Sequence, residues 1–250
     1  MPSFSYEASP WQIREDLPAA YRAEWQGLAQ PGSWWTGAER VAIAEEVRRA
    51  QGCPLCVERK QALSPFSVDG EHAHAEASVL SDVAIDTVHR LVTDASRLSR
   101  TWVEKLAAQG VSDGHYVELL GVVVVVISID SFHQGLGLPL EPLPMPEAGE
   151  PTGHRPAGLE HETAWVPMIQ AGKAQGEDAD LFSGGPQTAN VIRALSLVPD
   201  AVRSLKNVSA AQYVPTWAVG DPSYSEGRAL ERGQIELVAG RVSALNECFY

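Results

Sequence analysis

Cysteine is scarce in this chain of 250 residues: three cysteines are too few, and odd in number, for a disulfide-stabilised scaffold. Basic residues are also a minority, since 19 Lys and Arg face 32 Asp and Glu and give a net charge of -13. Because a field of that sign repels phosphate backbones, we expect no nucleic-acid partner. The composition that remains, 44% hydrophobic and 20% charged, is typical of a globular protein with a sizeable core.

Long apolar runs are missing as well. The longest, over residues 119–127, is far below the roughly 18–20 residues that cross a bilayer. The first residues have neither the basic start nor the apolar stretch of a secretory signal. We therefore expect a cytoplasmic protein without membrane contact, in which thiols stay reduced unless they take part in chemistry.

Hydrophobic periodicity predicts a mostly helical chain, and no segment carries a convincing hairpin signal. Residues 37–51 are expected to form a helix that starts after Thr36, with Glu39 placed to complete a capping box. Residues 71–109 predict one or two helices that end near Gly110. The five valines at 122–126 fit a strand or a wholly buried helix equally well.

The expected organisation is an N-terminal arm, a helical repeat, a Pro-rich linker and a second helical repeat that is cut short. These segments cover residues 1–36, 37–138, 139–187 and 188–250. The linker is predicted because prolines recur from residue 139 to residue 156 and prevent regular structure there. A weak internal likeness between the halves suggests two diverged repeats, which we expect to form one intertwined domain.

Further helices are expected in the arm and in the second repeat, over residues 18–29, 188–198, 201–213 and 226–248. Pro199 should end one helix and begin the next, because proline is well tolerated in the first turn. The final helix would place four apolar residues on one face: Ile235, Val238, Val242 and Leu245.

Cys53-Pro-Leu-Cys56 is a Cys-x-x-Cys motif at a predicted helix end. A peroxide can oxidise one such thiolate to a sulfenic acid, which the second thiol resolves as a disulfide. Two inert core cysteines are the second interpretation. A metal site is the third: His72 and His74 offer two more ligands, but their spacing departs from zinc-finger patterns. A short distance between the sulfurs, with a cavity beside them, favours redox chemistry.

The end of the chain carries a more specific pattern, in which eleven residues separate Glu236 from Cys248 on a predicted helix. This resembles the alkyl hydroperoxidase D / carboxymuconolactone decarboxylase superfamily, whose peroxidase branch has a helical glutamate before a Cys-x-x-Cys. The resemblance implies that Glu236 is a base and that Cys248 is a resolving thiol. The second member of the pair would be residue 251, which the sequence does not contain. Three explanations stay open: a natural chain end, a truncation, or a UGA codon for selenocysteine that was read as a stop.

The first half resembles the same superfamily less closely. Cys53 and Cys56 fit the redox pair, with Cys56 as the peroxidatic thiol and Cys53 as the resolving thiol. Val41 and Lys60 stand where that family has its glutamate and histidine. A proton relay must then come from elsewhere.

Glu118 and His133, which flank the valine run, are the candidates for that relay. Their alternative interpretation is a surface carboxylate and a hydrogen-bonded core histidine. Three further segments also resemble the family and lie over residues 116–121, 129–144 and 191–199.

The resemblance implies an all-α helical bundle of two diverged repeats that assembles as a homo-oligomer, with the valine run as a buried helix. It implies a thiol-dependent peroxidase that reduces hydroperoxides without a metal or organic cofactor. Electrons would come from a thioredoxin-like or lipoyl dithiol protein. A decarboxylase-like non-redox enzyme, in which His133 or Glu118 handles protons, is one alternative, and a non-catalytic oligomeric scaffold is another.

Overall fold

The computed structural model describes residues 4–7, 9–74, 78–182, 188–225, 227–246 and 248. Within these ranges the fold is mostly helical, as the periodicity predicted, and its one sheet has two short strands. In chain order the α-helices are α1 (Asp16–Ala29), α2 (Gly37–Ala50), α3 (Pro54–Gln61), α4 (Asp82–Asp94), α5 (Arg100–Ala108), α6 (Asp113–Gly135), α7 (Asn190–Arg193), α8 (Pro199–Gln212) and α9 (Arg232–Leu245). The described residues also contain three short 3-10 helices, η1 (Ala95–Arg97), η2 (Gly176–Leu181) and η4 (Thr216–Ala218).

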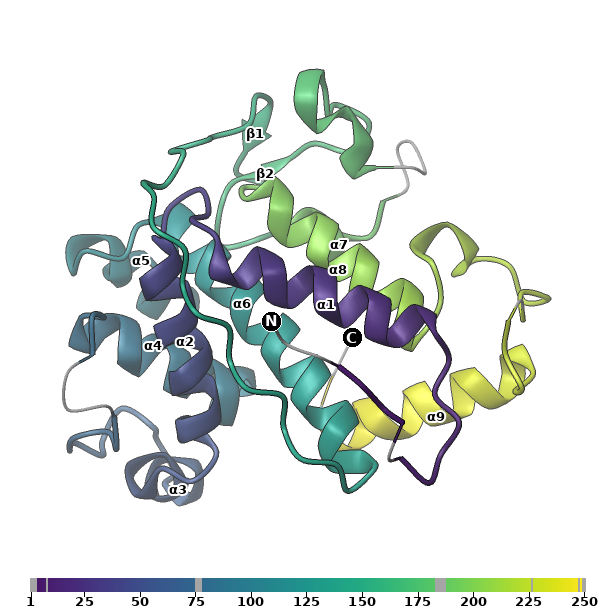
Figure 1. Cartoon of the computed structure of the whole chain (residues 1–250). Coiled ribbons are helices and arrows are strands. Elements are labelled where there is room, and N and C mark those ends of the chain that lie inside the picture. Colours follow the sequence, from purple (N-terminus) through teal and green to yellow (C-terminus); the bar gives the residue numbers. More distant parts are fainter. Residues whose placement is uncertain are drawn as a thin grey trace.

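Helix α6 runs through the middle of the molecule, with α2 and α4 packed on one side and α1 and α8 on the other (Figure 1). The valine run lies within it, so this run forms a buried helix and not a strand. Gly121 has a structural purpose here, because an added Cβ would lie 2.8 Å from the Cβ of Ala201 on α8. By length and composition α6 qualifies as a membrane span, and 61% of its most apolar window is buried inside the fold.

Local sequence signals set several helix ends as predicted. The Thr36 hydroxyl accepts from the backbone N–H of Glu39, and the Glu39 carboxylate accepts from that of Thr36, which completes the capping box. The segment 71–109 contains α4, η1 and α5, and the chain leaves α5 through Gly110 at a φ of 95°. Pro199 occupies the first turn of α8.

Several elements differ from the prediction, among them α3 (Pro54–Gln61), which no expected helix covers. A hairpin joins β1 (Leu159–Glu160) to β2 (Met168–Ile169), and strands of two residues are too short to give an alternating pattern. The helix expected over 188–198 is confined to α7. The residues after α7 form turns, and two hydrogen bonds hold them against β2. The Ser196 hydroxyl accepts from the N–H of Ile169 at 2.8 Å, and the Arg193 guanidinium donates to the carbonyl of Ile169 at 3.2 Å.

The predicted linker over residues 139–187 has no helix or strand up to residue 158, where its prolines lie, and this part runs along the helices (Figure 1). Its later described residues contain β1, β2 and η2. The N–H of Glu147 donates to the carbonyl of Ala29 at 2.8 Å, and the Trp25 indole N–H donates to the carbonyl of Pro142 at 2.9 Å. The arm before residue 36 is also part of the core, because Tyr21 and Trp25 on α1 are fully buried.

The last helix, α9, starts at Arg232 and ends at Leu245, inside the predicted range 226–248. Its apolar side chains are exposed: Val238, Val242 and Leu245 have 57%, 51% and 65% of their surface accessible. The predicted apolar face is therefore present, but it does not contribute to the core that surrounds α6.

A buried ion pair joins α2 to α6, and breaking it should lower the stability of the fold. Asp130 is almost fully buried and accepts from the Nε and Nη2 atoms of Arg48, both at 2.8 Å. Replacing Asp130 with Asn leaves the guanidinium without its anion, so Asp130→Asn should lower the free energy of unfolding by about 3 kcal/mol in urea denaturation. Asp180→Asn breaks an exposed pair with Arg203 and should cost less than about 1 kcal/mol. Equal losses in the two variants would contradict this account.

A cysteine and histidine cluster as the candidate functional site

The start of α3 places both cysteines of the Cys-x-x-Cys motif. Cys53 is the N-cap residue of α3, Pro54 occupies the first turn and Cys56 follows in the same turn. Both cysteines therefore lie at the positive end of the α3 helix dipole. Cys53 is fully buried and Cys56 is 3% exposed. Both are thiols, without a disulfide between them.

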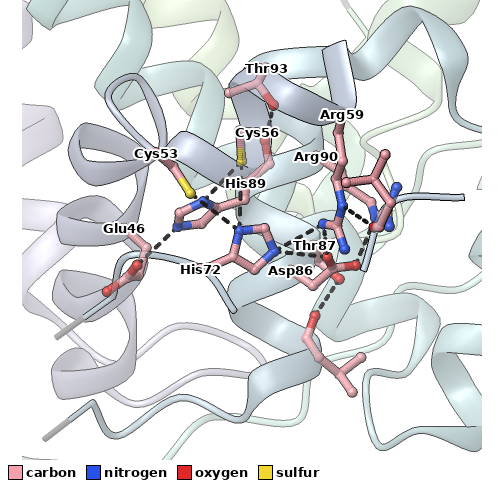
Figure 2. Close-up of polar contacts among 12 residues, drawn as sticks. Glu46, Cys53, Cys56, Arg59, His72, Asp86, Thr87, His89, Arg90 and Thr93 are labelled. Carbon is pink, nitrogen blue, oxygen red and sulfur yellow. Dashed lines mark hydrogen bonds and ion pairs between the residues drawn. The ribbon is translucent and has the colours of Figure 1, made fainter. Parts of the chain in front are cut away.

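Two histidines face these sulfurs, as Figure 2 shows. His72 comes from the segment between α3 and α4, and its Nδ1 atom lies 3.6 Å from the Sγ atom of each cysteine. His89 comes from α4, and its Nδ1 atom lies 3.3 Å from the Sγ atom of Cys56. The two sulfurs and the two facing nitrogens all lie within 4.8 Å of one another.

A carboxylate holds each imidazole from behind. Asp86 accepts from the Nε2 atom of His72 at 2.9 Å, and Glu46 accepts from the Nε2 atom of His89 at 3.1 Å. Because a carboxylate only accepts hydrogen bonds, each Nε2 carries a proton, and in a neutral ring the Nδ1 lone pair then faces the sulfurs. Arg59 Nη1 lies 3.1 Å from the Nε2 atom of His72, and both groups donate to Asp86.

The electrostatics of the metal-free cluster favour a thiolate beside an imidazolium. Burial opposes ionisation of Cys53, but hydrogen bonds from the backbone of Ala73, from His72 and from Cys56 outweigh it and lower the thiol pKa to about 7. Burial likewise opposes protonation of His72, yet Asp86 and the two sulfurs raise its pKa to about 10.

His89 behaves in the opposite way. Burial lowers its pKa, and the charge on His72 adds to this, although hydrogen bonding to Glu46 works against the shift. Near neutral pH this leaves His89 as a neutral imidazole. The two histidines of the cluster are thus held in different protonation states by their surroundings.

A cavity of about 360 Å³ opens beside Cys56, between the end of α2, α3 and α4. Gln51, Lys60 and Thr93 line it with Cys56. The Lys60 ammonium lies 3.8 Å from a carboxylate oxygen of Asp94 in an ion pair. Cys56 therefore borders an open cavity, whereas Cys53 is not among the residues that line it.

Glu118, one candidate for the proton relay, is engaged elsewhere. It is buried on α6 and accepts from Arg40 Nη1 and from the backbone N–H of Trp34, both at 2.6 Å. An added Cβ at Gly32 would collide with its carboxylate at 1.8 Å, so the glycine makes room for this contact. Glu118 is thus a buried carboxylate that links α6 to α2 through Arg40, and no hydrogen bond joins it to the cysteines.

His133, the other relay candidate, is buried near the end of α6. Its Nε2 atom lies 2.8 Å from the Tyr6 hydroxyl, and its Nδ1 atom has no hydrogen-bond partner among the described residues. It lines a separate cavity of about 1090 Å³ together with Trp25 and Met145. No hydrogen bond connects His133 to the cysteine cluster.

The second predicted site lies on a different part of the molecule. Glu236 on α9 is paired with Arg232 at 2.6 Å and accepts from the Tyr213 hydroxyl. Cys248 is exposed, and its backbone N–H donates to the carbonyl of Ser243. Figure 1 shows α9 and α3 on opposite sides of the molecule, so the two cysteine regions do not form one site.

Sequence reasoning found Cys53 and Cys56 and considered His72 only as a weak metal ligand. It missed the residues that complete the site: Glu46, Asp86 and His89. Glu46 and His89 carry a recognisable signal, because they are polar residues on the apolar faces of amphipathic helices. Near the cysteines, the structure therefore places a carboxylate and a histidine that come from positions other than Val41 and Lys60.

In comparisons with known proteins, no family model, no curated protein and no solved structure matches the chain. The chemistry of the site is therefore inferred from its own geometry.

The contact between His72 and Cys53 predicts the pH dependence of thiol reactivity in metal-free protein. Above about pH 7, the pKa of this thiol, Cys53 should be mostly thiolate, so its reaction with iodoacetamide should be faster there than at lower pH. His72→Asn removes the stabilising imidazolium and should move the midpoint of this reactivity towards the ordinary thiol value of 9.0.

The label on each cysteine is located by mass spectrometry of the digested protein. His74→Asn, which changes an exposed neighbour, is the matched control and should leave the midpoint in place. An unchanged midpoint in His72→Asn would show that the imidazole does not stabilise the thiolate.

Proposed function

We propose that the chain is a thiol-dependent peroxidase-like protein of the alkyl hydroperoxidase D-like kind, which reduces hydroperoxides through Cys53 and Cys56. One observation carries the proposal: two neighbouring thiols, each in contact with a carboxylate-oriented imidazole, lie beside a cavity that reaches one of them. Such a dithiol stays reduced in a reducing compartment such as the cytoplasm, so it is available for turnover there.

Cys56 is the better candidate for attack on the peroxide, because it lines the cavity. Neutral His89 takes the thiol proton through Nδ1, and Glu46 stabilises the imidazolium that forms. The thiolate then attacks one peroxide oxygen, so a sulfur–oxygen bond forms as the oxygen–oxygen bond breaks. The leaving alkoxide takes the proton back from His89 and departs as an alcohol, which leaves Cys56 as a sulfenic acid.

Cys53 is suited to the second step because its sulfur lies within 4.8 Å of the sulfur of Cys56. Its thiolate attacks the sulfenic sulfur, a disulfide forms, and the departing hydroxide takes a proton from the His72 imidazolium to give water. Two electrons from a thioredoxin-like or lipoyl dithiol then restore the thiols by exchange. Each cycle consumes one hydroperoxide and oxidises one dithiol.

The test is hydroperoxide consumption by chelator-treated protein with a dithiol reductant. Cys56→Ser and Cys53→Ser should each lower the rate by at least about 100-fold, because each removes a sulfur that the cycle needs. Cys53→Ser should still accumulate a sulfenic acid at Cys56 that a dimedone reagent traps. Cys248→Ser is the matched control and should react like the original chain.

The opposite result is also defined. Equal rates of peroxide consumption in the original chain, Cys53→Ser and Cys56→Ser would overturn the proposed function. Loss of activity in Cys248→Ser alone would show that peroxide reduction depends on Cys248, at the other end of the chain.

A further inference from the structure

We infer that Cys53, Cys56, His72 and His89 together bind one zinc ion. This goes beyond the proposed function, because thiolates that ligate a metal are not available to attack a peroxide in the same state. The metal-loaded chain and the metal-free dithiol are therefore two forms of one site.

The distances between donor atoms carry the inference. In a tetrahedral zinc site, sulfur ligands at about 2.3 Å and nitrogen ligands at about 2.0–2.1 Å lie about 3.5–3.6 Å from each other. The Nδ1 atom of His72 is 3.6 Å from both sulfurs, and that of His89 is 3.3 Å from the sulfur of Cys56. Since all four donor atoms lie within 4.8 Å of one another, one ion can contact all of them with small adjustments.

The orientation of the imidazoles is the second argument. Histidines that ligate a metal commonly donate their other ring N–H to a carboxylate, which fixes the ring and strengthens the ligand. Both histidines have such a carboxylate behind them, Asp86 for His72 and Glu46 for His89. Two imidazoles that are each oriented by a carboxylate, with both Nδ1 atoms facing the same two sulfurs, match the requirements of a metal.

Charge and burial give the third argument. Two thiolates and two neutral imidazoles carry a charge of −2, which a divalent cation neutralises, so the loaded cluster is buried at low cost. Cys53 and His89 are fully buried, and the side chain of His72 is 8% exposed. Thiolate and imidazole donors in a tetrahedral set favour zinc over magnesium or calcium, which prefer oxygen.

The site would be a closed one, because four protein ligands leave no position for water or substrate. The ion would join the turn that leads into α3, the segment between α3 and α4, and α4 itself. Structural zinc of this kind contributes to folding free energy, so the loaded chain should also be more resistant to heat.

Cobalt(II) is the probe for the test, because its visible spectrum reports both geometry and thiolate ligation. Metal-free full chain is titrated with Co²⁺ and then with Zn²⁺. We expect one Co²⁺ per chain, intense visible bands of a tetrahedral ion, a sulfur-to-cobalt charge-transfer band, and displacement of cobalt by zinc. The weak spectrum of a six-coordinate cobalt ion, or no uptake, would overturn the inference.

Variants assign the ligands. His72→Gln and His89→Gln should each weaken Zn²⁺ binding by at least about 100-fold, and Glu46→Gln should weaken it by about 10–100-fold through the orientation of His89. His74→Gln and Cys248→Ser are matched controls and should bind as the original chain does. Unchanged zinc affinity in both His72→Gln and His89→Gln would overturn the inference. If either variant does not fold, the cobalt spectrum of the original chain remains the test of tetrahedral thiolate ligation.

Failure of this inference and failure of the proposed function give different results. A chelated chain that consumes peroxide but takes up neither cobalt nor zinc contradicts the metal site and leaves the dithiol function in place. A chain that binds one zinc ion but consumes no peroxide after chelation contradicts the dithiol function and leaves the metal site in place.

Discussion

The Asp86 carboxylate accepts hydrogen bonds from three segments that are separate in sequence, and the geometry of the site depends on it. It accepts from His72 at 2.9 Å, from Arg59 on α3 at 2.6 Å and from Arg90 on its own helix at 2.7 Å. These cations and hydrogen bonds outweigh burial and hold the pKa of Asp86 well below its usual range. Because Asp86 stays charged, its hydrogen bonds hold the segment with His72 against α3 and α4, and the Nδ1 atom of His72 faces the sulfurs.

The same arrangement supports two kinds of chemistry that exclude one another. Without a metal, the cluster provides a thiolate, a neutral base and a second thiol whose sulfur lies within 4.8 Å of the first. With a divalent cation, the four donors complete a tetrahedral set and both sulfurs are occupied. Availability of zinc and the redox state of the thiols would then determine which form of the protein predominates.

Features set by neighbouring residues were predictable from the sequence, and features set by long-range packing were not. The capping box at Thr36 and the helix start at Pro199 depend on a few adjacent residues and agree with the structure. The valine run was ambiguous because a buried helix and a buried strand have the same apolar pattern. The motif of Cys53 was recognisable, but its partners Glu46 and His89 are brought together only when α2 packs against α4.

The central claim is that two sulfurs and two imidazole nitrogens form one site, and X-ray absorption at the zinc edge tests it most directly. For the zinc-loaded chain, the account predicts a first shell of two sulfurs at about 2.3 Å and two nitrogens at about 2.0–2.1 Å, with the outer-shell scattering of imidazole rings. A first shell of oxygen and nitrogen alone, or one with a single sulfur, would contradict it.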